Sequence, residues 1–528
     1  MKSLLRLLPL LCLLLSPAQT QAVTKPNIIF ILCDDLGYGD VRCLNPEGKI
    51  ATPHMDRLAA EGMIFTDAHS GSSVCTPTRY GVMTGRYAWR SKLQSGVLGG
   101  LSPRLIEQGR LTVPAFLKQN GYHTACVGKW HLGMDWVRTG EISEMSIEKP
   151  VQVRNVDYTK PVTNGPTSVG FDTYFGISAS LDMVPYCFIE NDRVAAHPTE
   201  TMKIPMNGAK GGFTREGPGS PGFRGEDVLP ALTQRALKII GEKAADAKNG
   251  KPFFIYMPLN SPHTPIVPSE KWQGKSGLSL YADFVMETDD SIGKVMRATE
   301  ENGLAQDTLI IVTSDNGCSP SADFPFHLSK GHNPSHNLRG HKADIFDGGH
   351  RVPFIVRWPA RVKGGQKTAQ LTCLTDLMAT AADILGQKLP EDAAEDSFSF
   401  LPALTGQKSA VTRPNIIHHS INGSFAIREG SLKLNLCADS GGWSDPRPGT
   451  APAGSPESQL YDLSTDIAEQ NNLLNSRSED AARLKALLEA QISQGRSTPG
   501  PAQKNAVEVV LRKAAPKKGQ PKKAKAQK

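Results

Sequence analysis

The feature that most constrains the fold is a series of short apolar runs separated by longer segments with helical periodicity. Buried strands are predicted at residues 27–33, 122–127, 252–257, 308–313 and 354–356. Amphipathic helices are predicted at residues 112–120, 229–247 and 282–302, each ahead of one of these strands. Strands that alternate with helices pack into a mostly parallel sheet covered by helices on both faces, so the sequence predicts an α/β fold.

The pattern changes after residue 411, where the predicted strands become short and alternate between apolar and polar residues. Such strands are predicted at residues 425–427, 432–436 and 459–463, followed by an amphipathic helix at 479–494. A chain of 528 residues also exceeds what one small core serves. We therefore expect a large α/β domain at residues 23–410 and a smaller α+β domain with a short antiparallel sheet at residues 411–500.

The first 22 residues have the pattern of a signal peptide. Lys2 and Arg6 precede the apolar stretch 7–15, and the small residues Ala18 and Ala22 follow it. The stretch is shorter than the ~20 residues that a membrane-spanning helix needs. No later stretch is long and apolar enough to span a bilayer. We expect an exported protein without a transmembrane segment, in a periplasmic, extracellular or lysosome-like compartment.

The formal net charge of +7 is concentrated at the two ends of the chain. Residues 501–528 are rich in Lys, Pro, Ala and Gln, and this composition predicts a disordered tail. The body between the signal peptide and the tail is mildly acidic. Nucleic acid is therefore not an expected partner, because its binding requires a basic surface on the folded body.

Polar side chains follow four of the predicted strands at the point where each strand ends. The four sets are Asp34-Asp35, Lys129 with His131, His263, and Asp315-Asn316. Ligand sites of open parallel sheets lie just beyond the carboxyl ends of the strands. We therefore expect these side chains to meet at one edge of the sheet.

Asp34, Asp35, Asp315 and Asn316 offer only oxygen atoms as ligands. Neighbouring carboxylates repel one another unless a cation lies among them, and oxygen ligands select calcium or magnesium. Taken alone, an Asp-Asp pair is common in a capped turn, and Asp-Asn-Gly is common in a β-turn. Their position at two strand ends favours a metal site, for which we expect Ca²⁺, with Mg²⁺ as the alternative.

Lys129, His131 and His263 add cationic and proton-donating groups to the same edge. Beside a metal ion, such groups suit an anionic tetrahedral substrate. Histidine can protonate a leaving alkoxide near neutral pH. Any one of these residues, taken singly, is equally typical of a surface position.

The most specific motif is Cys75-Thr76-Pro77-Thr78-Arg79, followed by Thr84-Gly85-Arg86. It resembles the C/S-x-P-x-R signature of the type I sulfatase family with its downstream T-G-R. Further stretches resemble family motifs in the expected order between residues 25 and 473; they are residues 34–40, 128–133, 314–317, 339–353 and 460–473. The departures are small, and include Thr78 for the commoner Ser and Asp347 for the usual Glu.

The resemblance implies the alkaline-phosphatase-like fold, in which helices sandwich a large mixed, mostly parallel sheet. It also implies an arylsulfatase-like enzyme that hydrolyses an aryl sulfate or a sulfated carbohydrate. In that family the cysteine equivalent to Cys75 is oxidised to Cα-formylglycine by a maturation enzyme, which becomes an expected partner. The hydrated aldehyde attacks sulfur, and sulfate leaves as the aldehyde re-forms.

The resemblance also implies a role for each matching residue. Asp34, Asp35, Asp315, Asn316 and the modified Cys75 bind the metal ion. Arg79 holds the formylglycine, while Lys129 and Lys342 contact the sulfate. His131 assists the nucleophile and the elimination of sulfate. His263 or Lys342 protonates the leaving alcohol, and His263 also belongs to the expected substrate-binding residues.

Several alternatives stay open. Related enzymes that hydrolyse phosphonate monoesters or phosphodiesters use the same nucleophile, and a non-catalytic glycan-binding protein is a more distant possibility. Eight cysteines remain after the signal peptide; setting Cys75 aside leaves an odd number, so disulfide pairing is either partial or absent. The histidine-containing loop 321–341 is interpreted as the rim of the site, and residues 135–170 and 203–227 as its outer wall.

Overall fold

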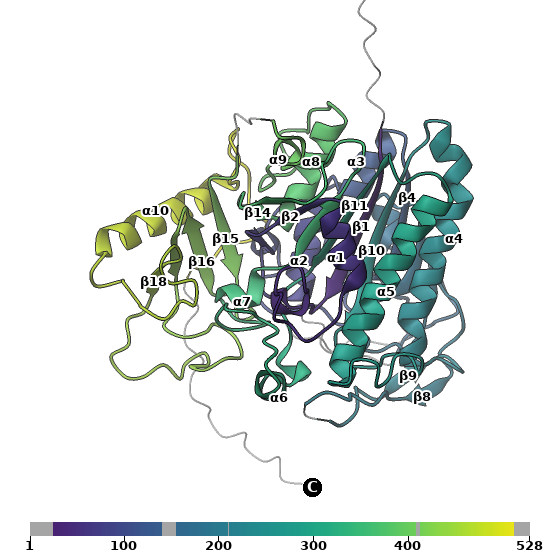
Figure 1. Cartoon of the computed structure of the whole chain (residues 1–528), viewed down its shortest axis with the longest axis horizontal. Coiled ribbons are helices and arrows are strands. Elements are labelled where there is room, and N and C mark those ends of the chain that lie inside the picture. The colour runs from purple at the N-terminus through teal and green to yellow at the C-terminus, as the bar shows by residue number, and fades with distance from the viewer. Residues whose placement is uncertain (1–24, 140–154, 210, 408–411, 512–528) are drawn as a thin grey trace, which may run out of the picture.

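The protein is described by a computed structural model covering residues 25–139, 155–209, 211–407 and 412–511. A ten-stranded mixed sheet forms its centre (Figure 1), in the order β13-β2-β12-β11-β1-β10-β4-β5-β6-β7. The five consecutive strands that run parallel are β11 (Thr308–Ser314), β1 (Asn27–Asp34), β10 (Phe253–Pro262), β4 (His123–Lys129) and β5 (Thr173–Ile177). All eight residues of β1 are buried, as expected of a parallel strand covered on both faces.

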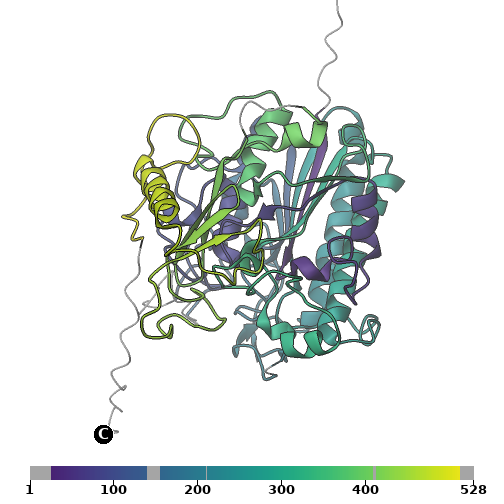
Figure 2. The ribbon, with the colours of Figure 1, turned by 60° about the vertical axis from the view of Figure 1, so that its left-hand side comes forward.

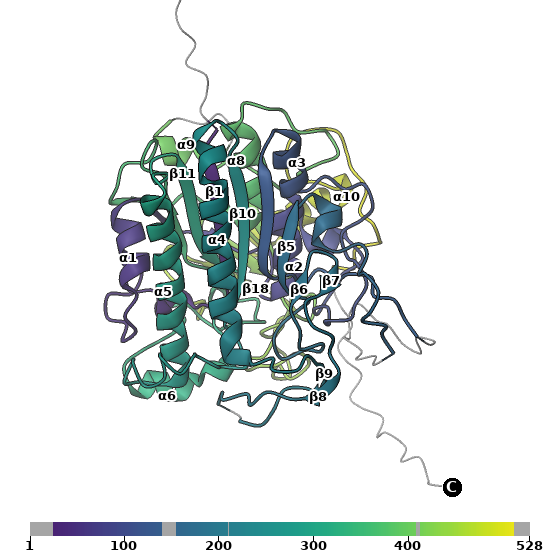
Figure 3. The same ribbon diagram turned by 90° about the vertical axis from the view of Figure 1, so that its right-hand side faces the viewer.

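Helices cover both faces of this sheet, which confirms the predicted sandwich. One face carries α1 (Pro53–Ala60), α4 (Val228–Lys248) and α5 (Leu280–Glu301), as Figure 3 shows. The other face carries α2 (Cys75–Thr84), α3 (Val113–Gln119) and α8 (Leu377–Ile384). The three helices predicted from periodicity are α3, α4 and α5, each within two residues of its predicted bounds.

The predicted strand at 354–356 is present as β12 (Phe354–Arg357), but it runs antiparallel to β11. The long connection from β11 to β12 stays at the carboxyl edge of the sheet, so the chain re-enters the sheet from that edge. β2 (Met63–Phe65) pairs with β12 and was not predicted, because three residues are too few to show a period. An antiparallel edge on a mostly parallel sheet is common in folds of this kind.

The smaller unit is a four-stranded antiparallel sheet, shown with its helix in Figure 2. Its strands are β15 (Asn415–His419), β16 (Phe425–Glu429), β17 (Leu432–Asn435) and β18 (Gln459–Asp462). Helix α10 (Ser478–Gln494) packs on this sheet through Leu484 and Leu488. The predicted antiparallel sheet and helix are confirmed, and β15 is an additional strand.

The remaining elements are short. The strands are β3 (Ala68–His69), β6 (Ile189–Glu190), β7 (Arg193–Val194), β8 (Glu200–Met202), β9 (Gly217–Gly219), β13 (Gln366–Thr368) and β14 (Thr372–Cys373). The helices are α6 (Phe324–Ser329), α7 (Asp347–His350) and α9 (Leu401–Thr405). None of the helices in the described ranges has the length and apolarity needed to cross a bilayer.

Residues 501–511 differ from the expected disordered tail, because they lie against the body of the protein. The Lys504 carbonyl accepts a hydrogen bond from Arg86 at 2.8 Å, and the Asn505 side chain accepts one from Arg90 at 3.1 Å. Val509 packs on the core of the small sheet. These contacts involve backbone and single side chains, which composition does not reveal. The rest of the expected tail and the expected signal peptide lie outside the described residues.

Candidate active site

The polar side chains predicted at the strand ends meet at one edge of the sheet. Asp34 is the last residue of β1, Lys129 is the last residue of β4, and Asp315 follows β11 directly. Cys75 begins α2, and Arg79 lies one turn further along the same helix. The ten predicted site residues are all buried; they are Asp34, Asp35, Cys75, Arg79, Lys129, His131, His263, Asp315, Asn316 and Lys342.

Three carboxylates pair with three cations in this cluster. Lys129 Nζ lies 2.6 Å from Asp34 Oδ2. Lys342 Nζ lies 2.7 Å from Asp35 Oδ1. Arg79 donates two hydrogen bonds to Asp315 Oδ2, from Nε at 3.1 Å and from Nη2 at 2.7 Å. The formal charges of these six side chains therefore balance, which makes their burial possible.

The backbone turn that follows β1 positions the carboxylate of Asp35. Asp35 has a φ of 65°, a left-handed conformation that is uncommon outside glycine and asparagine or aspartate. Its backbone N–H donates to Asp315 Oδ1 at 3.2 Å, and Asn316 Nδ2 donates to Asp35 Oδ1 at 2.7 Å. The turn thus directs the Asp35 carboxylate toward the loop after β11, which carries Asp315 and Asn316.

The pKa values in the cluster diverge. Burial by itself would raise the pKa of Asp34, but Lys129, His263 and Arg79 together hold it well below its usual range. Burial and the negative charge of Asp34 raise the pKa of Asp315, although Arg79 opposes that rise. A cation among these carboxylates would favour the ionised form of both.

The arrangement fits a hard divalent cation. Asp34 Oδ1 and Asn316 Oδ1 are buried oxygens without a hydrogen-bond partner in the part of the chain that the structure describes. Two further carboxylates, of Asp35 and Asp315, lie in the same cluster. Oxygen-only donors of this kind select calcium or magnesium over softer metals.

Cys75 is 3% exposed and starts the first turn of α2. Burial raises the pKa of its thiol, while the charges of Lys129 and Lys342 act in the opposite direction. The thiolate, not the thiol, is the nucleophilic form of cysteine. An unmodified Cys75 is therefore a poor nucleophile near neutral pH. Because positions four apart lie on the same helix face, Arg79 extends into the same cluster.

The two predicted histidines differ in their environments. His131 Nε2 lies 2.7 Å from the Leu98 carbonyl, so Nε2 carries the proton, and the buried Nδ1 has no hydrogen-bond partner among the described residues. Burial lowers the pKa of His131 well below its ordinary value, so its imidazole is neutral and Nδ1 is unprotonated. His263 Nε2 lies 3.6 Å from Asp35 Oδ2 and is 8% exposed as a residue.

The loop at residues 321–341 is not simply the rim of this site. His332 is fully buried, and its Nε2 lies 2.8 Å from Asp40 Oδ1. His327 Nε2 lies 2.9 Å from the Ser279 hydroxyl at the start of α5. These two histidines fasten the loop to the body of the domain. As expected from Pro334, no helix spans the pair His332 and His336.

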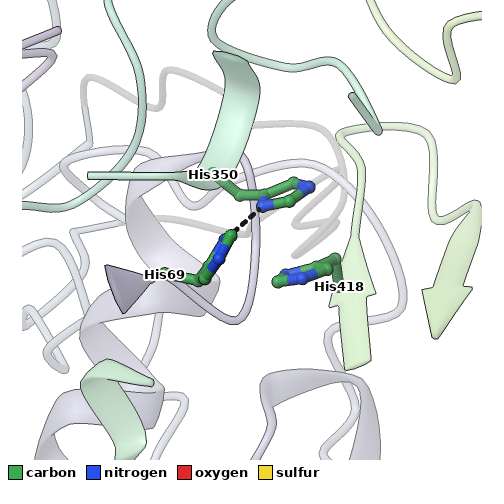
Figure 4. A group of neighbouring side chains, drawn as sticks. All are labelled: His69, His350 and His418. Carbon is green, nitrogen blue, oxygen red and sulfur yellow. Dashed lines mark hydrogen bonds between the residues drawn. The ribbon is translucent and has the colours of Figure 1, made fainter. Parts of the chain in front are cut away.

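A second histidine cluster lies between the short strand β3, helix α7 and strand β15 of the four-stranded sheet, as Figure 4 shows. His69 ends β3, His350 ends α7, and His418 lies on β15. His69 Nδ1 lies 3.1 Å from His350 Nδ1, and the rings of His350 and His418 stack with centroids 3.6 Å apart. No local pattern indicated this cluster, because His69 lies hundreds of residues before the other two and those are themselves well separated.

Hydrogen bonds account for His69 and His350, whereas the buried Nε2 of His418 has no hydrogen-bond partner among the described residues. Lys433 Nζ lies 3.1 Å from His350 Nε2, His350 Nδ1 shares a hydrogen bond with His69 Nδ1, and His69 Nε2 lies 2.9 Å from Asp67 Oδ1. A metal ion binds in the plane of each imidazole ligand. The ring planes of His350 and His418 differ by only 11°. An ion that lies in the plane of one ring therefore lies outside the plane of the other, so the two rings cannot bind the same ion.

We expect this cluster to make the fold acid-sensitive. Burial lowers the pKa of His69 to about 4 and that of His350 and His418 well below the ordinary value. The unfolded chain takes up these protons near pH 6.5. The stability that the neutral histidines contribute is therefore complete above about pH 6.5 and is lost as pH falls toward 4. Denaturation midpoints at pH 7 and pH 5 measure this loss.

A variant isolates the cluster in that measurement. His418→Phe keeps a stacked ring but removes one titrating group, so we expect a smaller difference between the two midpoints than in the wild type. His197 is exposed, and His197→Gln serves as the matched control with an unchanged difference. Identical pH dependence for wild type and His418→Phe would contradict the assignment.

Comparison with known proteins adds the following. A sequence model of the family described as Sulfatase matches residues 26–387. The N-acetylgalactosamine-6-O-sulfatase of Bacteroides thetaiotaomicron is 34% identical over 93% of this chain and 99% of its own length. Arylsulfatase A of Homo sapiens is 31% identical over 88% of this chain and 86% of its own. A solved structure from work on the metabolism of multiple glycosaminoglycans by Bacteroides thetaiotaomicron has a TM-score of 0.75 at 34% identity, covering 88% of this chain and 99% of that chain.

Proposed function

Because the chain belongs to the sulfatase family and is therefore a sulfuric ester hydrolase, we propose that it hydrolyses the sulfate ester of a carbohydrate with a formylglycine made from Cys75. One observation carries this proposal. The first residue of α2 lies in the same buried cluster as three carboxylates and three cations, at the carboxyl edge of the parallel sheet.

We propose that Asp34, Asp35, Asp315, Asn316 and the modified residue 75 hold a divalent cation, Ca²⁺ in the first place and Mg²⁺ as the alternative. The Oδ1 atoms of Asp34 and Asn316, which accept no hydrogen bond from the described residues, support this set. A bound cation of this kind polarises a sulfuryl oxygen and makes a hydroxyl more acidic. The formylglycine supplies, in its hydrated form, a hydroxyl that attacks sulfur and a second hydroxyl whose deprotonation expels sulfate.

The remaining residues bind the substrate and move protons. Lys129 and Lys342 each place an ammonium group in the cluster, where they stabilise negative charge that develops on the sulfuryl oxygens. Arg79 holds residue 75 and Asp315 in place. Neutral His131 presents an unprotonated Nδ1, with which it assists the nucleophile and the elimination of sulfate. His263, at the outer side of the cluster, donates the proton that the leaving alcohol oxygen requires.

The relatives suggest which ester is cleaved. The Bacteroides relative that is aligned over nearly its whole length is named for the 6-O-sulfate of N-acetylgalactosamine, as is a mouse relative 30% identical over 81% of this chain. We propose a 6-sulfated N-acetylgalactosamine residue as the substrate of this enzyme. Sulfated polysaccharide lies outside the cell, so this substrate agrees with the proposed export of the protein.

Kinetics on matured enzyme test this proposal against the phosphonate or phosphodiester hydrolase alternative. The protein is co-expressed with a formylglycine-generating enzyme and assayed in Ca²⁺ with 4-nitrophenyl sulfate, 4-nitrophenyl phosphate and a phosphonate monoester. We expect sulfate turnover to exceed the other two, and to fall when the cation is chelated. We also expect N-acetylgalactosamine 6-sulfate to be desulfated faster than the 4-sulfate. Negligible sulfate turnover by matured enzyme would refute the proposal.

A further inference from the structure

Asn260, near the carboxyl end of β10, is a buried polar residue without partners. It is 2% exposed. Neither its side-chain nitrogen nor its side-chain oxygen has a hydrogen-bond partner in the ranges that the structure describes. Nearly all buried polar groups in folded proteins are paired, so an unpaired carboxamide requires a specific explanation. A ligand that is present only during the reaction is one such explanation.

The position of β10 places Asn260 beside the proposed reaction centre. Strands β1 and β4 are not neighbours, because β10 lies between them. The Asp34–Lys129 ion pair of 2.6 Å nevertheless joins their ends, so it crosses over β10. In the pairing of β1 with β10, Leu32 lies opposite Pro258 and Asp34 lies opposite Pro262, with the irregular stretch of β10 between these two pairs. Asn260 therefore belongs to the segment that the ion pair crosses.

The backbone of β10 is irregular at this point. Residues 258 to 262 of β10 pair with residues 32 to 34 of β1, so β10 holds extra residues there. Bulges of this kind redirect side chains and occur beside active sites. The next residue, Ser261, accepts a hydrogen bond from Thr288 of α5 at 2.8 Å. The Ser261 hydroxyl therefore faces α5, and Asn260 is the residue before it in the irregular stretch, between the ends of β1 and β4.

We propose that Asn260 is a further substrate-binding residue, whose carboxamide donates a hydrogen bond to an oxygen of the sulfuryl group. This inference rests on the proposed function of the same site. A neutral donor suits a cluster in which three cations already balance three carboxylates, because it adds stabilisation without adding charge. The bound sulfate ester then completes the hydrogen bonding that the free enzyme leaves open.

Two variants and a matched control test the proposal. Asn260→Ala removes the donor, and Asn260→Asp replaces it with a negative charge. We expect kcat/KM for 4-nitrophenyl sulfate to fall by about 100-fold in Asn260→Ala and further in Asn260→Asp. Affinity for inorganic sulfate, measured by calorimetry, should fall in parallel. Asn435, at the end of β17, is also buried with both side-chain atoms unpaired, and Asn435→Ala should change neither quantity.

The denaturation midpoint separates binding from structure. Asn260→Ala breaks no protein hydrogen bond, so its midpoint should stay at the wild-type value. Turnover and sulfate affinity that both match the wild type would overturn the proposal. A lower midpoint with unchanged sulfate affinity would assign Asn260 a structural role and would also overturn it. If the wild type itself does not turn over sulfate esters, the proposed function fails. The sulfate affinities of wild type and variants still show whether Asn260 binds the anion.

Discussion

Cys75→Ala is expected to abolish sulfate-ester hydrolysis, with a loss of about 10⁴- to 10⁶-fold in kcat, the range found when a catalytic nucleophile is removed. The physical reason is that position 75 supplies the nucleophile at the start of α2, and alanine cannot be oxidised to an aldehyde. The measurement is turnover of 4-nitrophenyl sulfate by enzyme produced together with a maturation enzyme.

A control variant and a mass measurement accompany this experiment. Cys187 is another fully buried thiol, whose pKa burial raises to about 12, and Cys187→Ala should retain wild-type turnover. Mass spectrometry of the wild-type peptide that spans residues 71–79 should show a mass about 18 Da below that of the cysteine form, because CHO replaces CH₂SH. Substantial activity in Cys75→Ala, or an active wild type with an unmodified peptide, would contradict the mechanism.

Arg79→Met is expected to lower the free energy of unfolding by about 3–5 kcal/mol, as when one member of a buried ion pair is removed. Methionine approximates the volume of the side chain but leaves Asp315 without the two hydrogen bonds that Arg79 donates. It also leaves the nearby Asp34 carboxylate, 3.6 Å from the guanidinium, less compensated. Turnover should be lost as well, since Arg79 positions residue 75. The measurement is the shift of the denaturant midpoint at pH 7.

The pH dependence identifies the cause of this loss. Without Arg79 the pKa of the buried Asp315 rises further, so the carboxyl takes up a proton in the folded state as pH falls. The wild-type Asp315 carboxyl has a pKa raised to about 7, so the deficit of Arg79→Met should shrink as pH falls from about 9 to 7 and stay nearly constant below that. Arg57, whose side chain is 45% exposed and pairs with Glu61, gives the control: Arg57→Ala should cost at most about 1 kcal/mol. A similar cost for both variants would contradict the buried-pair explanation.

The predicted strands and the site agree with the structure where a local pattern was long or chemically distinctive. The apolar run at residues 27–33 corresponds to β1, which is buried along its whole length. The carboxylates of Asp34 and Asp35 follow it at the carboxyl edge, where parallel sheets bind their ligands. The same rule correctly grouped Lys129 and Asp315, which are far apart in sequence. The strands β2 and β15 were not predicted, and nothing in their local sequence alternates clearly between apolar and polar residues.

Other features were invisible because they depend on partners distant in sequence. His327 and His332 were interpreted as part of a rim, yet each is held by a group on another element, Ser279 and Asp40. The segment 501–511 has the composition of a tail, yet Arg86 donates a hydrogen bond to its backbone and Arg90 donates one to its Asn505 side chain. Nothing in a local window indicates whether a polar residue will find such a partner.

The sequence by itself determined the alternation of strands and helices, the carboxylates and cations at the strand ends, and the cysteine motif at residue 75. These follow from periodicity and side-chain chemistry, which are local properties. Only the tertiary structure decided which cation pairs with which carboxylate, that the Asp34–Lys129 pair joins two strands on either side of β10, and that His350 and His418 stack beside His69. Those outcomes depend on the order and register of strands, and non-local packing sets both.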